Sequence, residues 1–165
     1  METIDRLIDT RELQEALEQL AHDITNGYKD KLIREDHKAT GQLLASIQTD
    51  VEVAGTTYSV VLHLEDYWKY LEEGTRPHWP PRDAILKWIK AKPVIPYPGK
   101  DGRIPSPESL AFLIQRKIAR VGTKGTHDLR ETTESIIPYW MERLKEILGR
   151  LYGNYIQSIV AFPKK

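Results

Sequence analysis

The chain has 165 residues, of which 40% are hydrophobic and 29% are charged. This length predicts a single domain over residues 1–165, with a core large enough to fold without cross-links. The chain contains no cysteine, which excludes disulfides, thiol nucleophiles and thiolate metal sites. No apolar run approaches the roughly 20 residues of a membrane helix, and the charged first residues lack the apolar stretch of a secretory signal. We therefore expect an intracellular globular protein with no membrane partner.

The net charge is zero, but the charges are unevenly distributed along the chain. Residues 1–75 hold 16 acidic and 7 basic residues, a net charge of −9, whereas residues 76–124 hold 3 acidic and 11 basic residues, a net charge of +8. Residues 125–165 hold 5 acidic and 6 basic residues. This asymmetry indicates that the basic region meets nucleic acid, a partner protein or the acidic part of another copy, unless it is an ordinary solvated face.

The first predicted element is a long helix over about residues 11–35. Apolar residues recur every three or four positions from Leu13 to Leu32, which is the pattern of a helix with one buried face. Asp9 and Glu12 have the spacing of a capping box at its start.

A β-hairpin is predicted next, over about residues 48–64. It follows one or two possible helical turns in the segment LLASI, residues 43–47. Apolar and polar residues alternate on both sides of a short turn that contains Gly55, which is the pattern of two half-buried strands.

Three shorter helices follow the hairpin, and they are predicted over residues 65–75, 83–92 and 107–121. Gly74 and Gly122 end the first and the third, and Gly74 suits a left-handed cap. Ser106 is placed to cap the third, with proline at its first position. The segments GTRPH (74–78) and GTKGTH (122–127) look alike, but their flanks do not match well enough to indicate a duplication.

The remaining segments are two loops and a last long helix. The proline-rich loop covers residues 92–105 and the second loop covers residues 122–128. Apolar spacing around Ile137–Leu151 predicts the last helix, which Pro138 either starts or kinks. Residues 154–162 either extend this helix or form an edge strand. The predicted fold class is α+β, with a long N-terminal helix, a small antiparallel sheet built on the hairpin, and further helices joined by proline-rich loops.

The sequence shows no recognised catalytic or metal-binding pattern. It has no H-E-x-x-H spacing, phosphate-binding loop or nucleophile elbow. His63 lies near Glu65 and Asp66, but these residues would need a third metal ligand from elsewhere. Glu72 and Glu73 are expected to form a solvated helix end, because adjacent helical residues point in different directions. We expect no catalytic residues, cofactor or metal, and a protein that is not an enzyme.

The basic region also contains aromatic residues, as nucleic-acid sites do. Trp88 fits the apolar face of its own helix with Ile85 and Ile89, so only Trp79 and Tyr97 are expected to be available to a ligand. The candidate contacts with a partner or with DNA are Arg76, Trp79, Arg82, Tyr97, Lys100, Arg103, Arg116, Lys117, Arg120 and Lys124.

The order of features between residues 36 and 91 is more specific than any single motif. A Thr-Gly-x-Leu-x-x-Ser-Ile type of segment follows the long helix, and a Tyr-x-x-x-x-Glu-x-Gly-Thr type of segment follows the hairpin before a proline-rich step into a helix. In this order the chain resembles the head–tail joining proteins of long-tailed bacteriophages, the neck or tail-completion group that includes the minor tail protein Z of phage lambda. Lys38-Ala39 stands where the family usually has a proline. The positions that match the first segment are Thr40, Gly41, Leu43 or Leu44, Ser46 and Ile47. The positions that match the second segment are Tyr67 or Tyr70, Glu73, Gly74 and Thr75.

This resemblance implies a structural protein of the virion, assembled in the host cytoplasm. It implies a homo-oligomeric ring of six or twelve copies around the DNA channel, with other neck, head-completion and tail-terminator proteins as partners. DNA would lie nearby without being read for its sequence. The matched positions are expected to form turns, and the two loops to reach neighbouring rings. The alternatives are a tail-terminator ring protein, a basic nucleic-acid-binding adaptor, or a metal-dependent hydrolase built around His63 and Asp66.

Overall fold

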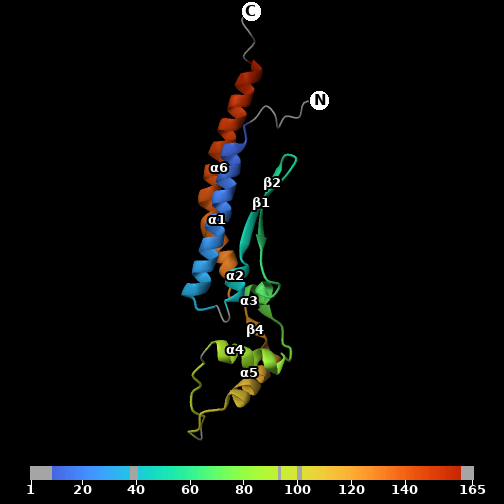
Figure 1. The fold of residues 1–165 in the computed structure, drawn as a ribbon, viewed down its shortest axis with the longest axis vertical. Helices are drawn as coiled ribbons and strands as arrows, with labels where there is room; N and C mark the ends of the chain where they lie inside the picture. Colours follow the sequence, from blue (N-terminus) through green and yellow to red (C-terminus); the bar gives the residue numbers. More distant parts are fainter. Residues whose placement is uncertain (1–8, 38–40, 93, 100–101, 161–165) are drawn as a thin grey trace, which may run out of the picture. The chain divides into compact units, whose positions relative to one another are not determined.

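A computed structural model describes residues 9–37, 41–92, 94–99 and 102–160 (Figure 1). It confirms the predicted mixture of helices and a small antiparallel sheet. None of the helices in these ranges is long and apolar enough to cross a membrane. In chain order the elements are α1 (Arg11–Arg34), α2 (Gln42–Ser46), β1 (Gln48–Ala54), β2 (Thr57–His63), α3 (Trp68–Glu73), β3 (Gly74–Thr75), α4 (Arg82–Ala91), α5 (Pro107–Val121), β4 (Thr123–Lys124) and α6 (Asp128–Val160).

The chain forms two compact units, each assembled from separate segments. Unit 1 comprises residues 1–30, 47–63 and 130–165, and unit 2 comprises residues 31–46 and 64–129. Counted over the sequence, unit 1 has 14 acidic and 9 basic residues, a net charge of −5. Unit 2 has 10 acidic and 15 basic residues, a net charge of +5. The two units therefore carry opposite charge.

In unit 1, α1 and α6 lie side by side and run in opposite directions (Figure 1). Arg150 of α6 pairs with Glu12 near the start of α1, while the Trp140 Nε1 donates to Asp23 further along α1, at 2.9 Å. Large apolar side chains fill the space between these helices and the hairpin. The buried members of this core are Leu13, Ala16, Leu17, Trp140 and Ile147.

The predicted hairpin is confirmed as strands β1 and β2, which pair antiparallel with Val51 opposite Val60. Its inner residues pack on the unit 1 core. The Thr49 hydroxyl also donates to the Ala21 carbonyl of α1, at 3.2 Å. The hairpin is thus attached to α1 by both apolar and polar contacts.

The ends of α1 and α6 differ from the sequence-based expectations. Asp9 accepts the Arg11 backbone N–H, at 3.2 Å, in place of the predicted capping box, and side-chain hydrogen bonding from Arg11 lowers the pKa of Asp9 to about 2. Helix α6 begins at Asp128 and passes through Pro138, so Pro138 does not start it. The same helix continues to Val160, which answers the question left open for residues 154–160; residues 161 and 162 lie outside the described ranges.

The three shorter helices that follow the hairpin, α3, α4 and α5, agree with the sequence prediction within three residues at each end. Ser106 caps α5 as expected, because its hydroxyl oxygen accepts the Ser109 backbone N–H at 3.3 Å. Helices α4 and α5 are joined by the predicted proline-rich loop, in which the Gly99 N–H donates to the Arg103 carbonyl at 2.8 Å.

Candidate functional site

The centre of unit 2 is a two-stranded ribbon made from the two segments that look alike in the sequence. Strands β3 and β4 pair antiparallel, with Gly74 opposite Lys124 and Thr75 opposite Thr123. The two threonine hydroxyls lie 3.0 Å apart. Helices α3 and α5 are therefore each followed directly by a Gly-Thr segment, and these two segments pair with each other as strands.

Glycine is required at both corners of this ribbon. Gly74 has φ 75° and ψ −167°, and Gly122 has φ 73° and ψ −160°, a backbone region that is essentially restricted to glycine. A Cβ on Gly122 would lie 1.9 Å from the Thr75 carbonyl oxygen. The positive φ expected at Gly74 is confirmed, but the left-handed helical cap is wrong, because the chain turns directly into a strand.

The prediction that Glu72 and Glu73 form a solvated helix end is wrong for Glu72, which is buried, whereas Glu73 is exposed. Glu72 is only 4% exposed, and its Oε2 accepts the Leu129 N–H at 3.0 Å. That N–H belongs to the first turn of α6, where helix donors have no partner within the helix. The α3 carboxylate therefore caps α6 from a distance of 57 positions in the chain.

A second buried carboxylate holds the segment that follows α1. Asp128 is 1% exposed, and its Oδ2 lies 2.5 Å from the Nδ1 of His37. Asp36, which directly precedes His37 in the chain, pairs with Lys92 just after α4, at 3.0 Å. These contacts fix the position of His37 at the wall of the cavity described next.

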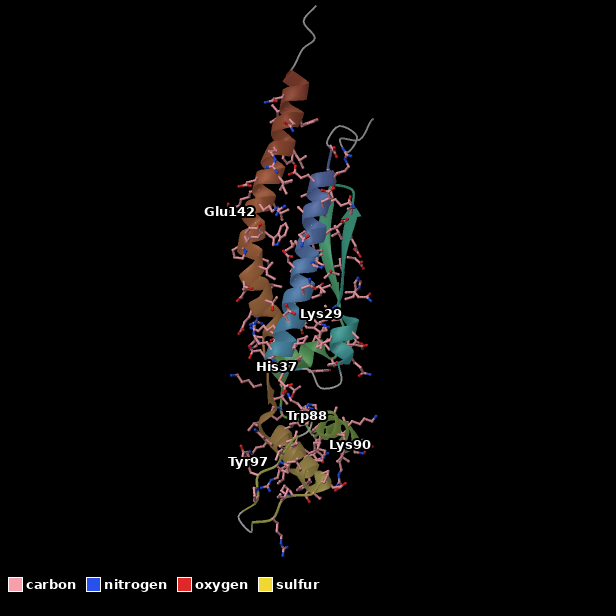
Figure 2. The ribbon with its side chains drawn as sticks, turned by 60° about the vertical axis from the view of Figure 1, so that its left-hand side comes forward. Lys29, His37, Trp88, Lys90, Tyr97 and Glu142 are labelled. Atoms are coloured by element: carbon pink, nitrogen blue, oxygen red, sulfur yellow. The ribbon has the colours of Figure 1, made fainter. Side chains whose placement is uncertain are left out.

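Unit 2 contains a cavity of about 1050 Å³ with largely apolar walls. The walls come from the end of α1, from α2, α3, α4 and α5, and from the ribbon. Large apolar side chains line it: Leu32, Leu44, Tyr70, Leu71, Trp88 and Ile118. Figure 2 shows two of its lining residues, His37 just after α1 and Trp88 on α4.

The polar lining of this cavity is basic. Its basic residues are His37, Arg76, His78, Lys87 and Lys124, and no Asp or Glu in the described part of the chain lines it. An apolar surface with basic groups and no carboxylate suits a ligand that combines apolar side chains with negative charge.

Tyr67 also lines the cavity, at the start of α3. Burial raises the pKa of the Tyr67 phenol above its usual value, and hydrogen bonding with the Leu43 backbone partly opposes the shift. The phenol therefore stays neutral at physiological pH and offers the cavity an uncharged hydrogen-bonding group.

The structure brings together several residues predicted separately from the sequence. Motif positions Gly41, Leu44, Gly74 and Thr75 all line the cavity, and so do the predicted contact residues Arg76 and Lys124.

Other motif positions lie elsewhere. The Ser46 hydroxyl donates to the Leu43 carbonyl at 2.9 Å and accepts the Glu65 N–H at 3.2 Å. Ile47 is buried and belongs to unit 1, while Glu73 is exposed at the end of α3. Thr40 lies outside the described residues.

The remaining predicted contact residues within the described ranges do not line the cavity. Trp79 packs edge-to-face on Phe112, with ring centroids 6.1 Å apart. Arg82 lies at the start of α4, and its guanidinium points to the Glu108 carbonyl at 3.5 Å. Lys100 lies outside the described residues. The others are exposed, on the loop after α4 (Tyr97, Arg103) or on α5 (Arg116, Lys117, Arg120).

Trp88 corrects the expectation that it faces inward. Ile89 is buried as predicted, but Trp88 is 38% exposed and lines the cavity. Helical periodicity marks the apolar side of α4, yet it does not distinguish a side chain in the core from one at the edge of a cavity.

The suggested metal site has no support in the described part of the chain. No group of three or more His, Asp or Glu side chains there is arranged to hold a metal ion. His63 instead lies 3.1 Å from Asp50 on the neighbouring strand.

Comparisons with protein-family models, with curated proteins and with solved structures gave no match.

Proposed function

We propose that this protein is a structural subunit of the bacteriophage neck, completing the tail and joining it to the DNA-filled head as part of a ring around the DNA channel. One observation carries the proposal: Gly41, Leu44, Gly74 and Thr75, which carry the resemblance to head–tail joining proteins, line one cavity. Motif positions that are far apart in sequence thus share a surface.

The chemistry of this cavity supports a binding role. Its apolar walls and basic lining suit contact with a protein segment. A closed ring needs two different patches on each subunit, which meet head to tail. The opposite charges of units 1 and 2 supply such patches.

Deletion of the gene from the phage that encodes it tests this function. We expect filled heads and complete tails of normal length to accumulate unjoined, and addition of the purified protein to restore joining. Joined, infectious particles formed without the protein would contradict the proposal. Overlong tails would instead identify a tail terminator, the alternative within the same structural class.

A second candidate, a nucleic-acid-binding adaptor, is favoured by the exposed basic and aromatic residues outside the cavity. Tyr97 is 91% exposed, and Arg116, Lys117 and Arg120 are exposed on α5. An adaptor with six to ten phosphate contacts would lose roughly 10³ to 10⁵ in affinity between 50 and 200 mM salt. Titration with duplex DNA at these two salt concentrations distinguishes the two functions.

A further inference from the structure

We infer that the tip of the β1–β2 hairpin of one copy docks into the unit 2 cavity of a second copy. The inference rests on the proposed ring and names the contact that would build it. The hairpin tip is defined here as residues 52–57, from Glu52 to Thr57.

The hairpin tip is an exposed segment that unit 1 does not use for its own packing. Val51, Tyr58 and Val60 pack on the core, whereas every residue of the hairpin tip is exposed. Val53 is 50% exposed. Figure 1 shows this end of the hairpin standing clear of α1 and α6. A short turn between two paired strands is already ordered, so little conformational entropy would be lost when it binds.

The hairpin tip carries the chemistry that the cavity lacks. Asp50 and Glu52 lie on β1, and no Lys or Arg occurs between residues 47 and 63. Asp50 already faces His63. Glu52 forms no ion pair with any residue in the described ranges. The tip therefore carries an apolar side chain, Val53, on one face of β1 and the Glu52 carboxylate on the other face.

The cavity offers matching groups. Arg76, Lys87 and Lys124 line it, and within the described part of the chain none of them pairs with a carboxylate. Apolar walls surround these cations, and a volume of about 1050 Å³ admits a turn of a few residues. Docking would place Val53 against the apolar walls and the Glu52 carboxylate among the cations.

A second copy fits this cavity better through its hairpin than through its acidic helix α1. Glu12 of α1 is already paired with Arg150, and the large apolar residues Leu13 and Leu17 are buried. The acidic face of α1 thus offers charge without an apolar anchor. A hairpin-to-cavity contact joins two different patches, which is the kind of head-to-tail contact that forms a ring when its rotation closes.

A cross-linking experiment tests the contact directly, because the chain has no cysteine of its own. Val53→Cys and Lys87→Cys proteins are purified separately, mixed, and treated with a short bismaleimide. We expect covalent dimers that contain one chain of each variant. The matched control pairs Val53→Cys with Lys69→Cys, an exposed α3 residue outside the cavity lining. No dimer with Lys87→Cys, or an equal yield with Lys69→Cys, would overturn the inference.

Charge reversal gives an independent test in the full chain. Glu52→Lys or Lys87→Glu alone should weaken self-association by about tenfold or more, measured by sedimentation, and the two combined in one chain should restore it. Glu146→Lys and Lys69→Glu change exposed charges outside the hairpin tip and the cavity lining, and they should leave association unchanged.

The two proposals fail in different ways. If cavity variants lose head–tail joining while hairpin-tip variants keep it, another neck protein occupies the cavity. The inference is then overturned and the proposed function stands. If deletion of the whole gene leaves joining intact, the proposed function fails by itself.

Discussion

The two units of this protein are stabilised in different ways. Unit 1 buries large apolar side chains, with Trp140 and Ile147 of α6 packed on α1 and the hairpin. In the described ranges unit 2 buries fewer apolar side chains, namely Leu32, Leu43, Ile89 and Ala111, and it adds close backbone contacts at glycines and buried polar groups. It also leaves apolar side chains around a cavity. Of the buried polar residues in the described ranges, Glu72, Gln115 and Asp128 belong to unit 2, and Thr132 belongs to unit 1.

This difference bears on function. Because unit 2 is held by the ribbon and by buried carboxylates, Tyr70 and Trp88 stay at the cavity surface. The comparison therefore predicts that core substitutions in unit 1 cost stability, whereas cavity substitutions in unit 2 cost binding.

The largest expected effect is in the unit 1 core. Trp140 is 2% exposed, and its ring nitrogen donates to Asp23. Trp140→Ala should lower the free energy of unfolding by about 4 kcal/mol, because it leaves a cavity in the core and removes the hydrogen bond to Asp23. Urea denaturation measures this change. A loss below about 1 kcal/mol would contradict the account of the core.

A single methyl group should also break the ribbon of unit 2. Gly122→Ala should cost about 3 kcal/mol, because the added Cβ meets the Thr75 carbonyl and the backbone is strained for alanine. The matched control is Gly149→Ala in α6, where nothing lies within 4 Å of the added Cβ. That variant should gain up to about 1 kcal/mol in thermal or urea unfolding, from helix propensity.

The buried carboxylate of unit 2 should have the next largest effect. Glu72→Ala removes the acceptor for the Leu129 N–H and should cost about 2 kcal/mol in urea unfolding. Glu72→Gln keeps an oxygen acceptor and should lose less than half as much. Equal losses in the two variants would show that the negative charge, and not the hydrogen bond, supplies the stabilisation.

The smallest effect on stability is expected at the cavity. Trp88 is partly exposed, so Trp88→Ala should change the free energy of unfolding by less than about 1 kcal/mol. It should nevertheless weaken self-association, because aromatic residues in pockets dominate interface energies. Sedimentation and urea unfolding of the same sample separate the two effects. A large loss of stability with unchanged association would contradict the comparison.

Local patterns predicted most elements of the fold but little of the site. Period-two alternation around Gly55 gave the hairpin, and Ser106 gave the start of α5. The burial of Glu72 was missed, because its partner Leu129 lies 57 residues away and no local spacing shows it. The faint likeness of the two Gly-Thr segments was the one available sign of the ribbon. Their pairing depends on tertiary structure, and sequence periodicity carries no information about it.

The central claim is that this chain assembles with copies of itself in a ring. Light scattering of the purified protein, alone and after adding the neck and tail proteins that we propose as its partners, measures the mass directly. The account predicts a discrete oligomer of six or twelve 19.1 kDa chains in at least one of these conditions. A mass of 19.1 kDa that stays unchanged in all of them would contradict it.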